Sequence, residues 1–249
     1  KTPAPELDAP LRWNLTDGMI HAYESTTVSK LQWQVDDKFI LKTTNYLKAS
    51  VKVKGRKDGM SYVVGKIKSG KRKWNDPKLE EEKWTEYSAM ELKQEPAGVT
   101  QGMREDGSFK GGVGPSGQDL DTILFRLPSK MLNVGEHEEF ELNFDIEVDR
   151  TTLVVTGKAK ITLSGYRKIE GRLFARFFTE FDMSNLDVPP EFKGTVSSAY
   201  RWKSVSYFDV ERRTIHSIEA AFLITIRCDT PWTKSVWVTD AMFTLVREK

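Results

Sequence analysis

Apolar and polar residues alternate without interruption between Glu139 and Asp149. A period of two places successive side chains on opposite faces of a β-strand, so this run predicts a sheet with one dry face and one wet face. At about 3.4 Å per residue the run would span roughly 37 Å, which exceeds the usual strand and suits a broad, curved antiparallel sheet. The apolar positions are Phe140, Leu142, Phe144, Ile146 and Val148.

Similar alternation recurs in two blocks of the chain, one on either side of residue 115. Because turn-forming residues such as those at 57–59 separate neighbouring runs, adjacent strands are expected to form hairpins. We therefore predict a mainly β protein of long curved antiparallel sheets, arranged as a half-barrel or a sandwich. The further predicted strands cover residues 30–35, 51–54, 62–67, 153–163, 174–181, 218–226 and 241–245.

One segment departs from this alternation and predicts an amphipathic helix near 77–93. Asp76 is a favourable N-cap, and Pro77 suits the first helical position. Apolar side chains then follow at near-helical spacing, and we expect this apolar face of the helix to pack across the sheet. These side chains are Leu79, Trp84, Tyr87 and Met90.

Proline and glycine indicate where the chain divides. Residues 1–10 carry three prolines and predict an extended leader, as on a mature chain after cleavage of an export signal, and an ordinary frayed terminus is the alternative. Residues 106–119 are rich in glycine and predict a flexible linker. The predicted organisation is therefore the leader, a β-rich half with the helix over 11–105, the linker, and a second β-rich half over 120–249.

The two halves also share a sequence of features. Gly18 and Tyr23 recur as Gly135 and Phe140, 117 positions later, and in both cases a turn glycine precedes a strand with an inward aromatic residue. This recurrence predicts an internal duplication of two similar halves. One continuous curved sheet is the alternative.

The composition supports a packed fold without indicating a partner. With 249 residues, of which 39% are hydrophobic, the chain can fill a sizeable core. Lysine and arginine total 38 against 36 aspartate and glutamate residues, so the net charge of +2 gives no argument for nucleic acid, and none is predicted as a partner. The lone Cys228 excludes an intrachain disulfide and is expected to be a small core residue.

No motif in the chain points to catalysis. Residues 112–117 match the dinucleotide fingerprint G-x-G-x-x-G, but no adequate apolar strand precedes them, so a linker is the better interpretation. The three histidines are not spaced to ligate a metal together, and there is no G-x-S-x-G nucleophile elbow. We therefore predict a protein that is not an enzyme and has no cofactor, metal site or catalytic residues. A glycan hydrolase would need two carboxylates facing each other across a cleft.

The strongest local anomaly is electrostatic. Eleven lysine and arginine residues lie between Lys42 and Lys73, against the single acid Asp58. A hairpin of the predicted strands would present many of them to water, where they could engage an anionic polymer, lipid headgroups or an acidic protein. The alternative is that the lysines keep a sheet edge soluble and unpaired. No exposed aromatic residues are expected among them, which argues against nucleic acid. The candidate residues of this basic stripe are Lys52, Lys54, Lys66, Lys68, Arg72 and Lys73.

Seven tryptophans offer a second kind of binding surface. Tryptophan side chains on a sheet can stack on sugar rings, although most are expected to be core residues because each buries a large area. Trp74 and Trp232 lie beside turn-forming residues and are the candidates for sugar stacking.

Short motifs are spread over the C-terminal half, namely Leu127-Pro128, Val134-Gly135-Glu136, Gly165-Tyr166, Glu170-Gly171 and Tyr207-Phe208-Asp209. Together they resemble a pattern in uncharacterised exported proteins and lipoproteins of bacteria, where a leucine-proline pair leads into a V-G-D/E turn and a Y-F-D step precedes a strand. The chain departs from that pattern at His137-Glu138-Glu139, near which those proteins often carry a tryptophan. The resemblance implies an extracytoplasmic location and a β-rich fold, and it implies no activity.

Two functions fit these observations. In the first, the protein is a non-catalytic binding or assembly protein of the bacterial cell envelope, whose basic stripe contacts a protein partner or an anionic envelope polymer, and a lipid anchor before Lys1 could tether it to a membrane. In the second, the curved sheet, closed by the helix, carries a lipid or another small apolar ligand. A cavity lined by Phe144, Ile146, Phe177 and Phe181 would favour the carrier. A carbohydrate-binding module is a further alternative, and the oligomeric state is not indicated.

Overall fold

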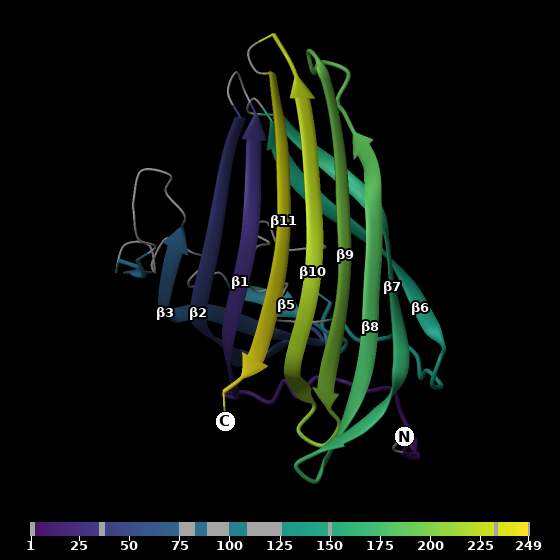
Figure 1. Ribbon diagram of the computed structural model, residues 1–249. Helices are drawn as coiled ribbons and strands as arrows, with labels where there is room; N and C mark the ends of the chain where they lie inside the picture. The colour runs from purple at the N-terminus through teal and green to yellow at the C-terminus, as the bar shows by residue number, and fades with distance from the viewer. Residues whose placement is uncertain are drawn as a thin grey trace.

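The computed structural model describes residues 3–34, 38–74, 83–88, 100–108, 126–148, 151–231 and 234–248, which form strands, turns and connecting segments but no helix. Within this part of the chain, no helix is long and apolar enough to cross a membrane. The described strands, shown in Figure 1, are β1 (Ile20–Gln34), β2 (Lys38–Lys57), β3 (Met60–Trp74), β4 (Thr85–Glu86), β5 (Thr100–Met103), β6 (His137–Val148), β7 (Thr151–Ile169), β8 (Arg172–Asp187), β9 (Thr195–Asp209), β10 (Thr214–Asp229) and β11 (Lys234–Arg247).

All eleven strands belong to one antiparallel sheet. The strand order is β4-β3-β2-β1-β11-β10-β9-β8-β7-β6, with β5 pairing with β3 outside this path. The first and last long strands, β1 and β11, lie side by side in the middle of the sheet. The end strands β4 and β6 do not pair with each other, so the described sheet is open and not closed into a barrel. The predicted fold class, long curved antiparallel β-structure, is confirmed.

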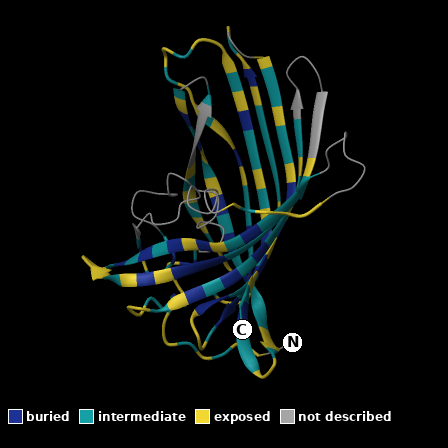
Figure 2. Cartoon of the chain, turned by 90° about the vertical axis from the view of Figure 1, so that its left-hand side faces the viewer, coloured by how far each residue is buried: buried dark blue, intermediate teal, exposed yellow. Residues whose placement is uncertain are grey.

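Buried residues from distant strands show that the sheet curls. Val53 of β2 and Val63 of β3 lie in the same buried cluster as Ile161 and Leu163 of β7, although β3 and β7 are near opposite ends of the sheet. Neighbouring strands are about 4.8 Å apart, so a flat sheet could not bring these side chains together. Figure 2 shows the strands bending around this side of the molecule. We call the face that carries the cluster the inner face and the opposite face the outer face.

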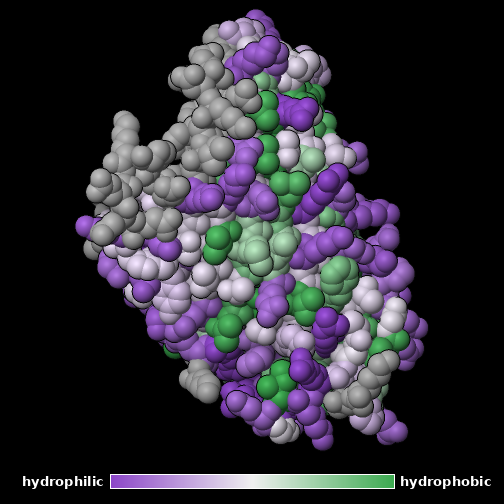
Figure 3. Space-filling model, in the orientation of Figure 1, coloured by the Kyte–Doolittle hydropathy of each residue, from purple (hydrophilic) through white to green (hydrophobic). Residues whose placement is uncertain are grey.

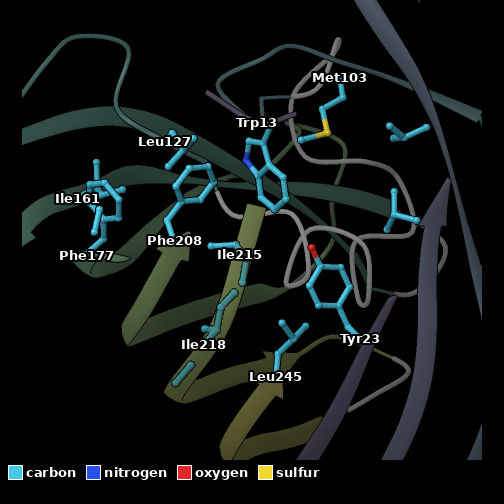
Figure 4. Packing of buried hydrophobic residues seen from close by; sticks show 14 of the residues in the cluster. Trp13, Tyr23, Met103, Leu127, Ile161, Phe177, Phe208, Ile215, Ile218 and Leu245 are labelled. Carbon is cyan, nitrogen blue, oxygen red and sulfur yellow. The ribbon is translucent and has the colours of Figure 1, made fainter. Parts of the chain in front are cut away.

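Segments outside the long strands complete the core at one end of the inner face. Trp13, which precedes β1, is 1% exposed, and its ring meets that of Phe208 edge-on with 5.8 Å between the centroids. The backbone N–H of Trp13 donates to the carbonyl oxygen of Glu105 at 2.8 Å. Met103 of β5 and Leu127 are buried in the same cluster (Figure 4). We call this region, where the N-terminal segment, β5 and Leu127 cover the sheet, the closed end.

The alternating run at 139–149 forms strand β6, as predicted, up to Val148. Phe140 packs against the core cluster, whereas Glu139 and Glu141 are exposed. The dry and wet faces of this strand are therefore confirmed at these positions. The side chains of Phe144 and Ile146 and residue Asp149 lie outside the described residues.

The predicted helix over 77–93 is wrong where the structure describes this segment. Residues 83–88 contain no helix, and Thr85 and Glu86 form β4, which pairs with Arg72 and Lys71 of β3. The remaining residues of the predicted helix are outside the described part of the chain. Pairing with the edge of an existing sheet supplies backbone hydrogen bonds that a short isolated helix cannot match.

The hairpin predicted at 57–59 is confirmed. Asp58 and Gly59 connect β2 and β3 with φ values of 53° and 75°, the geometry of a two-residue turn that favours Asp-Gly. Glu170 and Gly171 connect β7 and β8 in the same way, with φ values of 49° and 79°. These turns join long strands of a single sheet.

The linker predicted over 106–119 lies outside the described residues after residue 108, so the domain boundaries stay predictions.

Candidate functional site

Away from the closed end, the inner face carries a second buried cluster of Leu153, Val155 and Met183, and the apolar residues beside it are only half buried. We call its described aromatic and aliphatic residues on β8, β9 and β10 the apolar inner patch. Whereas the side chains of the closed end are almost completely buried, every member of this patch keeps part of its surface accessible. The members are Phe181, Tyr200, Trp202, Phe222, Ile224 and Ile226.

Three rings of the patch form a row across neighbouring strands. Phe181 of β8 is directly opposite Trp202 of β9, which is directly opposite Phe222 of β10. The ring centroids are 6.0 Å and 5.7 Å apart, with interplanar angles of 5° and 16°. Cross-strand neighbours are close enough for such rings to stack, so the register of the sheet produces the row. The row forms a flat apolar surface without charge.

The patch continues along β10 towards the other end of the sheet. Ile224 and Ile226 follow Phe222 on the same face, and Ile226 is directly opposite Trp237 of β11, which is 45% exposed. Burial raises the pKa of Tyr200 to about 12, so its phenol stays neutral at physiological pH. The inward positions of β9 and β10 alongside the patch hold no charged side chain. An uncharged, half-exposed surface of this kind can hold an apolar ligand but cannot bind a cation or an anion strongly.

Three hydroxyl groups on β8 and β9 are buried rather than open to a ligand. The hydroxyl oxygens of Thr179, Ser198 and Ser206 have almost no accessible surface and no hydrogen-bond partner in the described structure. Ser206 lies at the closed end, directly opposite Phe177 and Ile218. A buried polar group without a partner costs free energy, so these hydroxyls weaken the packing of the sheet and offer no hydrogen bond to a ligand on the patch.

The basic stripe is divided between the two faces. The outer face exposes Lys52 of β2 together with Lys66 and Lys68 of β3. The Lys68 ammonium forms an ion pair with the Glu248 carboxylate, with 3.7 Å between nitrogen and oxygen. Lys54 is also exposed, near the end of β2. Arg72 is separated from them, because its guanidinium lies over the rings of Trp74 and Tyr87 at 4.8 Å and 5.1 Å.

An exposed aromatic ring lies among these cations, contrary to the sequence-based expectation. Trp84 is 46% exposed, and the ammonium groups of Lys71 and Lys73 lie 4.8 Å and 5.7 Å from its ring. The prediction failed because Trp84 was assigned to a helix packed on the sheet, whereas it adjoins β4 beside β3. Of the two sugar-stacking candidates, Trp74 contacts Arg72, and Trp232 lies outside the described residues.

The histidines do not gather into a site. His137 is exposed, His216 lies against the Phe174 ring, and His21 is buried at the closed end. In the part of the chain that the structure describes, no three His, Cys, Asp or Glu side chains are grouped to hold a metal ion. Cys228 is buried, as expected for a small core residue. The glycine-rich residues 112–117 lie outside the described part.

His21 instead belongs to a buried hydrogen-bond chain. Its Nε2–H donates to the carbonyl oxygen of Asn14 at 3.1 Å, so its Nδ1 accepts from the Thr214 hydroxyl at 3.1 Å. The Thr214 oxygen in turn accepts from the Tyr23 hydroxyl at 3.1 Å. Burial lowers the pKa of His21 to about 4, with the positive charge of Arg247 acting in the same direction and the bond to Asn14 opposing. The chain therefore requires a neutral imidazole.

We expect this histidine to make the protein sensitive to acid. The unfolded chain binds the His21 proton with a pKa near 6.5, but the folded chain does so only near 4. The stabilisation that comes from keeping His21 neutral is therefore fully present above about pH 6.5. It is lost as the pH falls to about 4, which lowers the free energy of unfolding by about 3 kcal/mol. Urea unfolding at a series of pH values should show that His21→Gln has a flatter profile across this window than the native protein. Parallel profiles for the two proteins would contradict the assignment.

Comparison with known proteins identifies a fold but no family. No protein-family model matches the chain, and no curated protein matches it. Among solved structures, the chain is similar to lipovitellin, in a structure concerned with lipid–protein interactions, with a TM-score of 0.50 and 11% identity. The alignment covers 95% of this chain and 26% of that chain, so this chain spans only a minor part of lipovitellin. At this identity the similarity concerns the fold alone.

Two further solved structures align over most of the chain. DynF from the dynemicin biosynthesis pathway of Micromonospora chersina has 6% identity and a TM-score of 0.26, with 99% of this chain and 92% of that chain covered. A DUF1329 family protein from Desulfovibrio piger has 10% identity and a TM-score of 0.20, with 91% and 85% covered. With TM-scores this low, neither similarity bears on function.

Proposed function

We propose that the protein is a non-catalytic carrier of a lipid or another small apolar ligand, which lies against the apolar inner patch. The observation that carries the proposal is the partial exposure of Phe222, Ile224 and Ile226 on the concave side of the sheet, beside a closed end that is fully packed. Apolar surface left accessible on the inside of a curved sheet gains free energy when a ligand covers it. Binding sites for small molecules are typically concave and mostly apolar, with a few polar groups.

The stacked rings of the patch indicate a ligand with an apolar chain. Phe181, Trp202 and Phe222 offer a flat surface without charge, against which an acyl chain can lie. A lipid supplies such a chain and can keep its polar group in water. Lipovitellin, whose fold this chain resembles, is described in terms of its interactions with lipid, which supports the same choice.

A location outside the cytoplasm is part of the proposal. It is supported by the resemblance of the C-terminal motifs to those of bacterial exported proteins and lipoproteins. The exposed lysines of the basic stripe, Lys52, Lys66 and Lys68, support a second contact through the outer face, with an acidic partner or an anionic envelope polymer. This contact would not involve the ligand surface, because the two faces of the sheet are opposed.

A single charge on the inner face should test the carrier function. Ile224→Asp places a carboxylate in the apolar inner patch, and it should weaken binding of an uncharged fluorescent lipid, the methyl ester of parinaric acid, about tenfold or more, because the charge must be desolvated beneath the ligand. The matched control is Thr225→Asp, which adds the same charge to the adjacent outward position. Fluorescence titration of both variants gives the comparison.

The two variants also separate loss of binding from loss of folding. Far-UV circular dichroism should show that both retain the sheet, and Ile226→Ser provides a milder inner-face change if Ile224→Asp is unstable. Equal affinities of the inner and outer variants for the ester, or no binding of any apolar probe by the native protein, would refute the carrier.

A further inference from the structure

Two apolar side chains lie together on the outer face, in the middle of the sheet. Val28 of β1 and Met242 of β11 are directly opposite each other and are 50% and 66% exposed. They line a hollow of about 360 Å³ together with Lys30, Lys42 and Lys73. Figure 3 shows this face, on which apolar residues lie among hydrophilic ones. The hollow thus combines exposed hydrophobic area with three cations.

Lysines outnumber acids among the described residues that line the hollow, which include Lys30, Lys42 and Lys73 but one acid, Asp240. Lys30 and Lys42 are directly opposite each other on β1 and β2, and neither forms an ion pair in the described structure. Like charges in this position destabilise a sheet, so an external anion between them would be favourable. Asp240 of β11 lines the hollow directly opposite Lys30, so it faces one side of Lys30 while Lys42 faces the other, and Lys42 has no acid directly opposite it on β1.

We propose that the outer face of β1, β2, β3 and β11 docks on a lipid bilayer that contains anionic lipids. The lysines of the hollow would meet the negatively charged headgroups, while Met242 and Val28 would enter the boundary between the headgroups and the acyl chains. Charge alone would serve equally for a soluble polyanion, but such a partner would leave the two apolar side chains exposed. The combination of cations with an apolar pair therefore favours a bilayer.

This docking surface is separate from the apolar inner patch. Val28 and Met242 belong to the outer face, whereas the positions next to them, Thr27 and Phe243, point inward. A protein docked in this way keeps its inner face directed away from the headgroups that it contacts. Docking and ligand binding can therefore fail independently, and each has its own test.

The test is co-sedimentation of the full chain with vesicles. We expect binding to vesicles of phosphatidylcholine mixed with phosphatidylglycerol, little binding to phosphatidylcholine alone, and weaker binding at higher ionic strength. Each lysine near an anionic surface adds about fivefold in affinity, so Lys30→Gln/Lys42→Gln should lower the partition coefficient about twenty-five-fold. Met242→Ser should lower it several-fold without changing the salt dependence.

The control carries the same charge change far from the hollow. Lys158→Gln/Lys160→Gln removes two lysines from β7, and it should alter vesicle binding less than twofold. Equal losses in the two double variants would show that only net charge matters and would overturn the docking surface. It would also be overturned if soluble polyphosphate bound native protein and Met242→Ser alike while vesicles bound neither, or if Met242→Ser abolished a dimer of the native protein in analytical ultracentrifugation.

Discussion

Replacing Trp13 by alanine should lower the free energy of unfolding by about 4 kcal/mol. The indole is 1% exposed and meets the rings of Phe208 and His21 edge-on, at centroid distances of 5.8 Å and 5.9 Å. Its loss would leave a cavity at the closed end, and this region cannot collapse easily because it is bounded by strands. Urea unfolding at neutral pH, followed by far-UV circular dichroism, measures the change.

The effect should also have a local signature. The backbone N–H groups of Trp13 and Asn14 donate to the carbonyl oxygens of Glu105 and Arg213, so the indole helps to hold the N-terminal segment on the sheet. Amide hydrogen exchange at these residues should be faster in Trp13→Ala. The matched control is Trp84→Ala, where the ring is 46% exposed and the loss should be below about 1 kcal/mol. Similar losses in the two variants would contradict the role of Trp13.

Most strands could be predicted because their inner positions are apolar and their outer positions polar. The residues at 218–226 illustrate this, since their alternation survives in β10. Strand β9 was missed as an element, because three of its buried inward positions, Ser198, Ser204 and Ser206, are serines. Small polar residues conceal a period of two, although they can lie next to large side chains, as Ser206 does directly opposite Phe177 of β8.

The basic stripe could be predicted only as far as the sheet stays regular. Arg72 is an even number of residues from Lys66 and Lys68, so a strict period of two would place all three side chains on one face. In the structure, β3 carries one residue more than β2 where it passes Lys48 and Ala49, which is a β-bulge. Side chains of β3 beyond the bulge therefore point to the opposite face from the one that a regular alternation predicts. Arg72 consequently faces the opposite way, onto Trp74. No local sequence signal identified this bulge.

The apolar inner patch could be predicted in composition but not in exposure. That Phe222, Ile224 and Ile226 share a face follows from the alternation along the strand. How much of each remains accessible depends on which segments cover the curled sheet, and that is decided by contacts between residues far apart in the chain. The closed end shows the same limit, since nothing near Trp13 in the sequence indicates its packing on Phe208.

The predicted duplication stays a prediction, and several shared details support it. The N–H of Gly18 donates to the carbonyl oxygen of Val53, and that of Gly135 donates to the carbonyl oxygen of Leu163. Register shifts follow at Val53 and Leu163, before the two-residue turns that end β2 and β7. The strand triplets β1-β2-β3 and β6-β7-β8 therefore share an entry turn, a bulge and an exit turn in the same order.

The Tyr207-Phe208-Asp209 motif has a structural role that explains its residues. Phe208 is completely buried at the closed end, and the carboxylate of Asp209, which is 2% exposed, organises the turn between β9 and β10. One carboxylate oxygen accepts from the backbone N–H groups of Glu211 and Arg212 at 3.2 Å and 2.9 Å. The other accepts from the guanidinium of Arg172 at 3.0 Å, which ties the turn to β8. The motif therefore joins three neighbouring strands at one point.

We expect Asp209→Ala to lower the free energy of unfolding by about 3 to 5 kcal/mol, because it leaves two backbone N–H groups and the partly buried Arg172 without their acceptor. Asp209→Asn should cost less, since an amide oxygen can still accept from the turn while the charge is lost. The matched control is Asp182→Ala, which breaks the ion pair with Arg201 at 3.1 Å, where both side chains are 63% exposed. An exposed pair contributes below about 1 kcal/mol, so urea unfolding should separate the two alanine variants clearly. If they were equally stable, the turn would be held by packing of Phe208 rather than by the carboxylate.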